Sequence, residues 1–170
     1  MEQSQKLDDK FWIGHSLHNI GLTYRFVNQD KGLEYYGRSL KIYEEIGDKE
    51  GMGHSLNNIG LYYELTKREY DKALEYNIRS LKIREEIDDN YEIGNSLSNI
   101  GILYMAKGEY DKALDFYNRS NIIKKELGDK FGLSFTLNSI GNVHSDKGDY
   151  DKALDYYGRS LEIKEEIGDK

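Results

Sequence analysis

Three histidines come nearest, by type and spacing, to a metal-binding or reactive site. His15 and His18 lie three residues apart, and His54 follows His15 by 39 residues. On a helix, a spacing of three places two imidazoles on one face, which a divalent metal ion can use. The chain has no Cys, and no carboxylate accompanies these histidines at a fixed place, whereas zinc sites need three or four protein ligands. We therefore expect polar surface histidines, with no metal and no cofactor.

Carboxylates and hydroxyls are numerous but lack a catalytic setting. The acidic pairs Glu44-Glu45, Glu85-Glu86 and Glu165-Glu166 recur along the chain, as solvated helix ends do. Acid and base work needs a closed site whose two carboxyl groups have separated pKa values, and a repeated exposed pair offers no such asymmetry. No serine stands in a nucleophile elbow, and no glycine-rich phosphate loop is present. We expect no enzymatic activity.

The elements that must position these side chains repeat about every 40 residues. Ser55 to Gly60 returns as residues 16–21, 96–101 and 136–141, and its glycines are 39, 41 and 40 residues apart. Tyr70 to Leu74 returns as residues 110–114 and 150–154. Such a fixed period indicates stacked supersecondary units. We assign one array over residues 1–170, with repeats at about 10–47, 48–88, 89–128 and 129–170, and residues 1–9 as the tail of a preceding helix.

Each repeat is predicted to be a pair of antiparallel helices. Met52, Leu56, Ile59 and Tyr63 form one apolar stripe of a 3.6-residue period. Gly47-Asp48 and Gly128-Asp129 read as a left-handed helix stop followed by an N-cap. The glycine inside each first helix costs about 1 kcal/mol relative to Ala, so we expect a partner helix to approach it closely. The second repeat has one extra residue around 66–69, and the first lacks one around Asn28.

Composition limits the partners and the compartment. The 170 residues carry 24 Lys and Arg against 31 Asp and Glu, a net charge of -7, which disfavours nucleic acid. No apolar run approaches the ~20 residues that cross a bilayer, so we expect neither a membrane span nor a secretory leader. The lack of Cys fits a reducing compartment, and we expect a cytoplasmic protein.

The repeat resembles a known family. Leu56-x-x-Ile59-Gly60-x-x-Tyr63, followed by Ala73, is similar to the signature of the tetratricopeptide (TPR) repeat, although Leu replaces the usual Trp and the closing Pro is missing. The period of 40 resembles the TPR arrays of Leu-Gly-Asn polarity adaptors, kinesin light chains and bacterial signalling proteins. The resemblance implies an all-α superhelix of about four helix-turn-helix repeats, a non-catalytic scaffold within a larger signalling or adaptor protein.

The resemblance also implies a concave groove lined by the first helix of each repeat. Because Leu56, Ile59 and Tyr63 face the core, the opposite side of that helix is the groove wall. The peptide-binding candidates are the residues at these outward positions in the four repeats: His15, His18, Asn19, Leu22, His54, Asn57, Asn58, Leu61, Asn95, Asn99, Ile102, Phe135, Asn138 and Asn142.

An asparagine ladder runs through these positions. Asn19, Asn58 and Asn99 recur, and Ser139 breaks the series in the last repeat. An amide can grip the main chain of an extended peptide, or it can bond only to a neighbouring helix or to water. TPR co-chaperones that clamp an acidic C-terminus carry Lys and Arg on this wall, and this chain carries His, Asn, Ser and Phe there, which disfavours that ligand.

Two further patterns leave alternatives open. Arg38, Arg79, Arg119 and Arg159 each follow an acid by four residues, and ion pairs within the helix explain them better than an anion site. Asn121 stands where the other repeats have Leu, so the third interface either contains a satisfied polar group or is weaker.

Two functions remain. The array binds an extended peptide or partner protein in its groove. Alternatively it is a structural element whose uncapped terminal repeats stack end to end and make homo-oligomers, with Phe11, Trp12 and Ile13 meeting the last helix of another copy.

Overall fold

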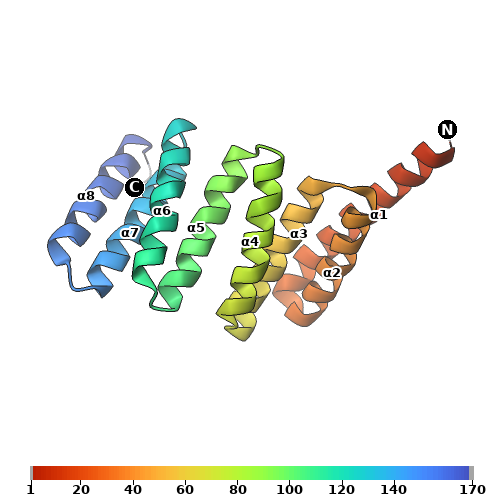
Figure 1. The fold of residues 1–170 in the computed structure, drawn as a ribbon, viewed down its shortest axis with the longest axis horizontal. Helices are drawn as coiled ribbons and strands as arrows, with labels where there is room; N and C mark the ends of the chain where they lie inside the picture. Colours follow the sequence, from red (N-terminus) through yellow and green to blue (C-terminus); the bar gives the residue numbers. More distant parts are fainter. Residues whose placement is uncertain (1, 169–170) are drawn as a thin grey trace. The chain divides into compact units, whose positions relative to one another are not determined.

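Antiparallel α-helices form the part of the chain that the structure describes. The computed structural model describes residues 2–168, with side chains from residue 6 onward. The helices are α1 (Glu2–Val27), α2 (Gln29–Ile46), α3 (Lys49–Tyr62), α4 (Tyr70–Glu86), α5 (Asn90–Ala106), α6 (Tyr110–Glu126), α7 (Lys130–Asp146) and α8 (Tyr150–Glu166), with a π-helical turn η1 (Tyr63–Lys67) between α3 and α4 (Figure 1). No strand occurs within residues 2–168, so the all-α prediction is confirmed.

The helices belong to two compact units. Unit 1 is Met1–Asp88 and unit 2 is Asp89–Lys170. In unit 1, α2 packs against α1 and α3, and α3 also packs against α4. In unit 2, α6 packs against α5 and α7, and α7 also packs against α8. Each unit therefore contains two helix pairs, and the first helix of each pair, α1 or α3 and α5 or α7, carries the predicted binding positions.

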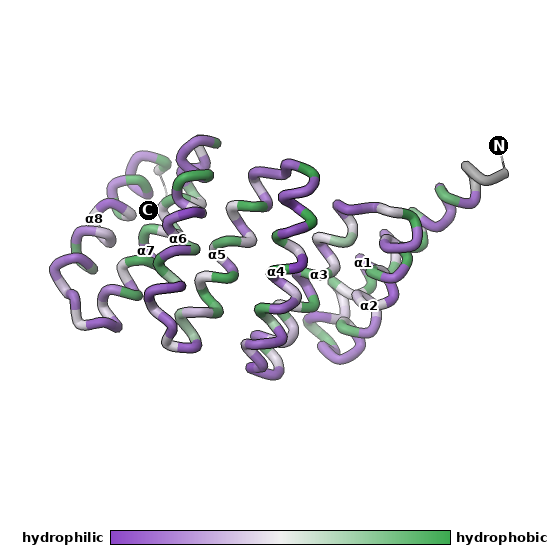
Figure 2. The backbone as a smooth tube through the Cα atoms, viewed as in Figure 1, coloured by the Kyte–Doolittle hydropathy of each residue, from purple (hydrophilic) through white to green (hydrophobic). Residues whose placement is uncertain are grey.

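Apolar residues at helical spacing form a core between the layers of each unit. In unit 1, Tyr36 and Leu40 of α2 pack on Leu56 and Ile59 of α3. In unit 2, Ala113 and Tyr117 of α6 pack on Ile140 and Val143 of α7. Hydrophobic and hydrophilic residues alternate around the helices accordingly (Figure 2). Of the predicted stripe, Leu56 and Ile59 are buried, and Met52 and Tyr63 are partly buried against the same cluster.

The joints between repeats follow the predicted stop and cap. Gly47 takes the left-handed conformation, with φ of 72°, and ends α2. Asp48 then caps α3, because its carboxylate accepts the backbone N–H of Gly51 at 3.1 Å. In unit 2, Asp129 accepts the N–H of Gly132 at 2.8 Å and starts α7 in the same way. These contacts confirm the expectation for both joints.

Glycines inside the first helices permit close helix contact. A Cβ placed on Gly21 would lie 2.7 Å from the ring of Tyr36, and one on Gly101 would lie 2.6 Å from the ring of Tyr117. Both distances are far below ordinary contact, so only Gly fits. The partner at each position is an aromatic ring of the second helix in the same pair. The predicted compensation for glycine in a helix is confirmed.

The two irregular repeat lengths have distinct structural outcomes. The extra residue of the second repeat is absorbed at the end of α3, where η1 forms a π-helical turn before Arg68 takes a left-handed φ of 53°. In the first repeat, Asn28 alone separates α1 from α2 and caps α2 through the N–H of Lys31. The helix α1 runs without a break from residue 2, so residues 2–9 continue the first helix of the first repeat and its first turns extend past α2 (Figure 1).

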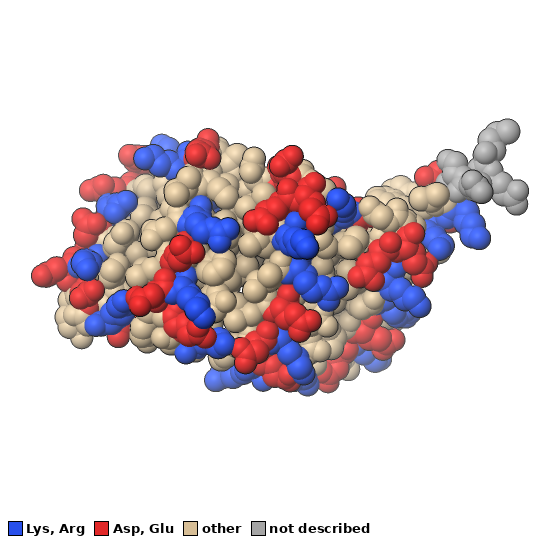
Figure 3. All heavy atoms as spheres, in the orientation of Figure 1, with Lys and Arg blue, Asp and Glu red and all other residues tan. Residues whose placement is uncertain are grey.

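One face of the surface carries charges of both signs. On the face shown in Figure 3, basic and acidic side chains are interleaved over each unit. Among residues 2–168, no helix combines the length and the apolar character that crossing a lipid bilayer requires.

Candidate functional site

A pocket of about 400 Å³ opens on the α1 and α3 side of unit 1. Its walls come from α1, from the end of α2, from the joint between α2 and α3, and from the first turns of α3. The lining residues are Phe11, His15, His18, Asn19, Leu22, Tyr43, Asp48, Glu50, Gly51 and His54. We call this the histidine pocket. It is large enough to take the side chain of a ligand residue and brings together five of the predicted binding residues.

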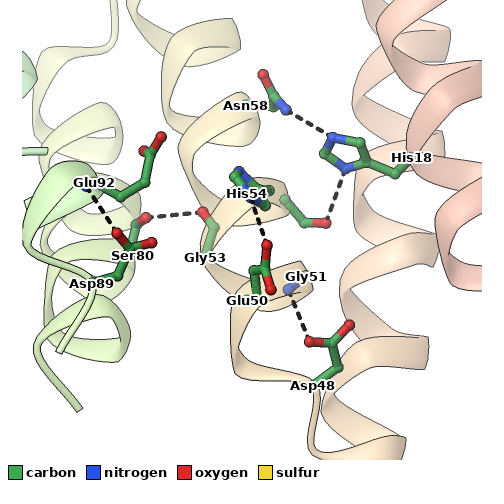
Figure 4. Close-up of polar contacts among 11 residues, drawn as sticks. His18, Asp48, Glu50, Gly51, Gly53, His54, Asn58, Ser80, Asp89 and Glu92 are labelled. Carbon is green, nitrogen blue, oxygen red and sulfur yellow. Dashed lines mark hydrogen bonds and ion pairs between the residues drawn. The ribbon is translucent and has the colours of Figure 1, made fainter. Parts of the chain in front are cut away.

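His18 is the most constrained of the three histidines. Its Nδ1 lies 3.4 Å from the hydroxyl of Ser55, and its Nε2 lies 3.4 Å from the amide nitrogen of Asn58 on α3 (Figure 4). Burial, with the nearby His54 and His15 as smaller causes, lowers the pKa of His18 to about 4. The ring is therefore neutral at pH 7, and because Ser55 and Asn58 engage its two nitrogens, it forms part of the pocket wall without a charge.

The other two histidines border the same pocket from opposite helices. His15 stacks on Phe11, with ring centroids 6.4 Å apart. On α3, the Nε2 of His54 lies 3.9 Å from a carboxylate oxygen of Glu50 (Figure 4). Within residues 2–168, no three His, Cys, Asp or Glu side chains are grouped in a way that could hold a metal ion. The arrangement offers uncharged and acidic hydrogen-bonding groups beside an aromatic ring.

Unit 1 places its asparagines in two different settings. Asn58 is half-buried, and its amide contacts His18 on α1. This is the alternative in which an asparagine of the ladder bonds to a neighbouring helix. Asn19 lies exposed on the wall of the histidine pocket. Asn57 and Leu61 are half-buried on α3. The ladder in this unit thus contains one asparagine that holds a neighbour and one that faces solvent.

Unit 2 presents a second set of predicted residues on α5 and α7. Phe135, Asn138 and Asn142 are exposed along α7. On α5, Asn95 and Asn99 are half-buried, and Ile102 packs against the core cluster of the unit. Asn142 accepts a hydrogen bond of 2.8 Å from the hydroxyl of Tyr157 on α8. The exposed part of the predicted face in unit 2 is therefore on α7.

Two serines at outward positions are buried instead. Ser139 donates to the carbonyl of Phe135 at 3.0 Å. Ser98 lies 2.8 Å from the hydroxyl of Ser120 and accepts from the buried amine of Lys124 at 2.9 Å. Burial lowers the pKa of Lys124, which is 3% exposed. Neither serine is free to contact a ligand, because the hydroxyl of each is buried and hydrogen-bonded within the unit.

The recurring arginines act mainly through aromatic rings. Each guanidinium lies over the ring of the residue three positions earlier, at 4.9 to 5.6 Å from its centroid; the pairs are Arg38 on Tyr35, Arg79 on Tyr76, Arg119 on Phe116 and Arg159 on Tyr156. The expected ion pairs also occur in the first and last repeats, Arg38 with Glu34 at 3.9 Å and Arg159 with Asp155 at 3.5 Å. Arg79 instead lies 3.6 Å from Glu44.

The sequence did not predict the wall of the histidine pocket that the end of α2 and the start of α3 form. Tyr43, Asp48, Glu50 and Gly51 line it, but their places in the sequence indicate only a core aromatic, a helix cap and a first turn. Glu50 precedes His54 by one helical turn, and that spacing is the one signal that could have pointed to it. The place of Phe11 in the pocket could be found only from the fold, because Phe11 precedes the repeated block of its own helix.

The repeat family follows from this geometry and from the match of the sequence. The family model for the tetratricopeptide repeat matches residues 12–86, 56–121 and 92–166. The chain therefore belongs to the tetratricopeptide repeat family, and its fold is the all-α solenoid of that family. Members serve as scaffolds for protein interaction, which is the general function of this chain. A search of the curated proteins finds no match.

Several solved structures share the fold. The chain is similar to BtubC from P. vanneervenii, with 24% identity over 92% of this chain and a TM-score of 0.83. It is also similar to the apo form of RapI, with 25% identity over 94% and a TM-score of 0.85, and to a Rap protein in complex with competence and sporulation factor, with 19% identity over 96% and a TM-score of 0.81. The chain corresponds to 65%, 58% and 45% of these proteins, less than two thirds of each.

Proposed function

We propose that the chain binds an extended peptide segment of a partner protein on the outward faces of its first helices. The observation that carries the proposal is the histidine pocket, because it joins five predicted residues in one hollow of about 400 Å³ on α1 and α3. A Rap protein of the same fold has been crystallised in complex with competence and sporulation factor, which supports a bound partner for this architecture. We further propose a non-catalytic role in the cytoplasm, with no nucleic-acid partner.

The chemistry of the faces suits recognition of a main chain. The amides of Asn19 and Asn58 can each bond to a peptide N–H or carbonyl, beside the neutral ring of His18. In unit 2, the exposed ring of Phe135 beside Asn138 offers an apolar contact next to an amide. Many such shallow contacts offset the entropy that a disordered ligand loses on binding.

The test starts from capture of partners with the purified chain, followed by titration of the bound segment as a synthetic peptide. Asn58→Ala combined with Asn99→Ala should weaken the peptide about tenfold, because two hydrogen bonds of ~0.5–1.5 kcal/mol each are removed. The melting temperature should fall by only about 2–4 °C, because Asn58 also loses its bond to His18. Asn118→Ala is the matched control, since it removes an exposed amide from the second helix α6. Unchanged affinity together with a large loss of stability in the double variant contradicts the proposal.

A second candidate function is end-to-end assembly of copies. Leu154 and Leu161 on α8 are 68% and 57% exposed, whereas Leu40, which occupies the place of Leu161 in the first repeat, is 8% exposed. On α1, Phe11, Trp12 and Ile13 are exposed as well. Stacking α8 of one copy on α1 of another would bury both sets. Light scattering over a concentration series tests this candidate, and a strict monomer at all concentrations eliminates it.

A further inference from the structure

The binding faces of α1 and α3 change from polar to apolar along their length. Residues three or four positions apart share one side of a helix. On α1 these residues are Phe11, His15, His18, Leu22 and Phe26, and on α3 and η1 they are Glu50, His54, Asn57, Leu61 and Leu65. The histidine pocket takes up the polar part of this surface. We call Leu22, Phe26, Leu61 and Leu65 the apolar end.

Contacts in unit 1 bring the residues of the apolar end to one place. Leu61 and Leu65 line a small cavity together with Arg25. The guanidinium of Arg25 lies 4.7 Å from the ring centroid of Phe26, so Phe26 borders the same region. Leu22 lines the histidine pocket as well. The apolar end and the histidine pocket therefore adjoin and form one continuous surface.

Two side chains of the apolar end are far more exposed than apolar residues of a repeat core. Phe26 is 79% exposed and Leu65 is 63% exposed. The third and fourth repeats have Ala106 and Asp146 at the same places, so the repeat itself does not require a large apolar residue there. Neighbouring exposed apolar side chains on a folded protein mark a surface that binds something.

The π-helical turn holds Leu65 in its position. The hydroxyl of Thr66 donates to the side-chain oxygen of Gln29 at 2.8 Å. Lys67 of the same turn lies 3.2 Å from a carboxylate oxygen of Asp30. Both contacts tie η1 to the start of α2. A surface that is already ordered loses little conformational entropy when a ligand binds, so this part of the apolar end is prepared for a partner.

The two parts of the surface carry opposite charges. The carboxylates of Asp48 and Glu50 line the histidine pocket, and no Lys or Arg is among its lining residues. The ring of Phe11 lies in the same pocket, and an aromatic face beside a carboxylate suits a guanidinium or an ammonium group. Arg25 places a positive charge at the apolar end instead. A basic ligand side chain is therefore favoured in the pocket and disfavoured at the apolar end.

The length of the surface sets the spacing of the ligand residues. His18 and Phe26 are eight residues apart on α1, which is about 12 Å along the helix at 1.5 Å per residue. An extended peptide advances about 3.3 Å per residue, and its alternate side chains point to the same side. Residues four positions apart in such a peptide share one side and span about 13 Å, which matches the distance along α1.

We propose that this surface binds a peptide segment in which a basic residue and a large apolar residue are four positions apart. The basic side chain enters the histidine pocket beside Glu50 and Phe11, and the apolar side chain packs on Phe26 and Leu65. The inference rests on the proposed peptide-binding function and adds the composition and the spacing of the bound segment.

Synthetic peptides with blocked ends test the composition and the spacing. The first probe has Arg and Leu separated by three Ser or Ala residues, and the second has the same residues in reverse order. In one control Glu replaces Arg, and in another the spacing is three, which puts the two side chains on opposite sides. One order of the Arg probe should bind at least about tenfold more tightly than the Glu control and about threefold more tightly than the short control. In an NMR titration it should shift the ring signals of both Phe11 and Phe26.

Variants of the full chain assign each probe residue to its part of the surface. Phe26→Ser should weaken the Arg probe about tenfold, because the Leu side chain loses its apolar contact. Phe131→Ser is the matched control, since Phe131 is an exposed ring on α7 of unit 2, and it should leave binding unchanged.

The charge is tested in the same way. Glu50→Gln should weaken the Arg probe about two- to fivefold at low salt, and added salt should reduce this difference. Glu75→Gln, on the exposed side of α4, is the matched control and should have no effect.

Three results overturn the inference. They are equal or tighter binding of the Glu control, no binding of the Arg probe in either order at millimolar concentration, and no effect of Phe26→Ser on the bound probe. A captured partner peptide that binds α1 and α3 without this pair of residues also overturns it, and leaves the proposed function standing. The proposed function fails by a different result, namely a captured peptide whose affinity no substitution on the outward faces of the first helices changes.

Discussion

The contact between Gly101 and Tyr117 gives the sharpest test of how the helix pairs are packed. In Gly101→Ala, the new Cβ would lie 2.6, 2.7 and 3.0 Å from three carbons of the Tyr117 ring. Carbon atoms normally approach to about 3.5–4.0 Å, so the ring must retreat by about 1 Å. Tyr117 is fully buried in the core cluster with Ala113, Ile140 and Val143, so its ring can move only if these neighbours move as well.

Two opposing terms set the size of the effect. Overpacking of a core costs about 1–3 kcal/mol, and three short contacts to a buried ring place this case in the upper part of that range. Alanine is more stable than glycine in a helix by about 1 kcal/mol. Gly101→Ala should therefore lower the free energy of unfolding by about 1–2 kcal/mol, which corresponds to a fall of about 2–8 °C in melting temperature.

Gly158→Ala is the matched control in the same unit. Gly158 lies inside α8, and a Cβ there would meet no atom within 4 Å. Only the helix term remains, so this variant should be more stable than the parent by about 1 kcal/mol. Urea unfolding followed by circular dichroism measures both. If Gly101→Ala is as stable as Gly158→Ala, the close approach does not explain why the first helices carry glycine.

Three further variants probe buried charge and capping. Lys124→Met should stabilise the protein by about 1 kcal/mol at pH 7, because it removes a buried amine while Ser98 and Thr136 keep their bonds to backbone carbonyls. The pKa of Lys124 in the folded state is below its usual 10.5, so near that pH the unfolded chain binds more protons than the folded one. The difference in free energy of unfolding between Lys124→Met and the parent should therefore shrink as the pH rises toward 10.5. A difference in urea unfolding that stays constant with pH speaks against a buried charged amine. The pKa of His18 is about 4 in the folded state against 6.5 in the unfolded state, so between these pH values only the unfolded chain takes up a proton. The free energy of unfolding of the parent should therefore fall by about 1–2 kcal/mol from pH 6.5 to 4, allowing for the partial exposure of the ring, and that of His18→Gln should fall less. Equal falls in the two pH series refute the assignment. Asp129→Ala removes the cap on the N–H of Gly132 and should cost about 1 kcal/mol, while Glu109→Ala, at a helix start without a side-chain cap, should cost little in the same assay.

The sequence by itself determined the repeat, the helix pairs and their joints. A period of about 40 residues, an apolar stripe at helical spacing, and Gly-Asp pairs at the joints are local signals, and each acts through backbone conformation or through neighbours one turn away. The glycine inside each first helix likewise pointed to a close partner, because its cost within a helix needs a compensating contact. The exposed residues of α7 and the walls of α1 lie where that stripe places them.

Only the tertiary structure decided which of these side chains act together. The histidine pocket needs Phe11, the joint at Asp48 and His54 of α3 at one place, and these are separated by up to 43 residues of sequence. Tyr36 belongs to the core cluster of unit 1, and the unpaired state of its buried hydroxyl became visible only when the helices were packed together. Periodicity reports which face of a helix is buried, because burial depends on the average environment of that face. A hydrogen bond or a cavity depends on the positions of single atoms from several helices, and these are fixed only when the helices pack.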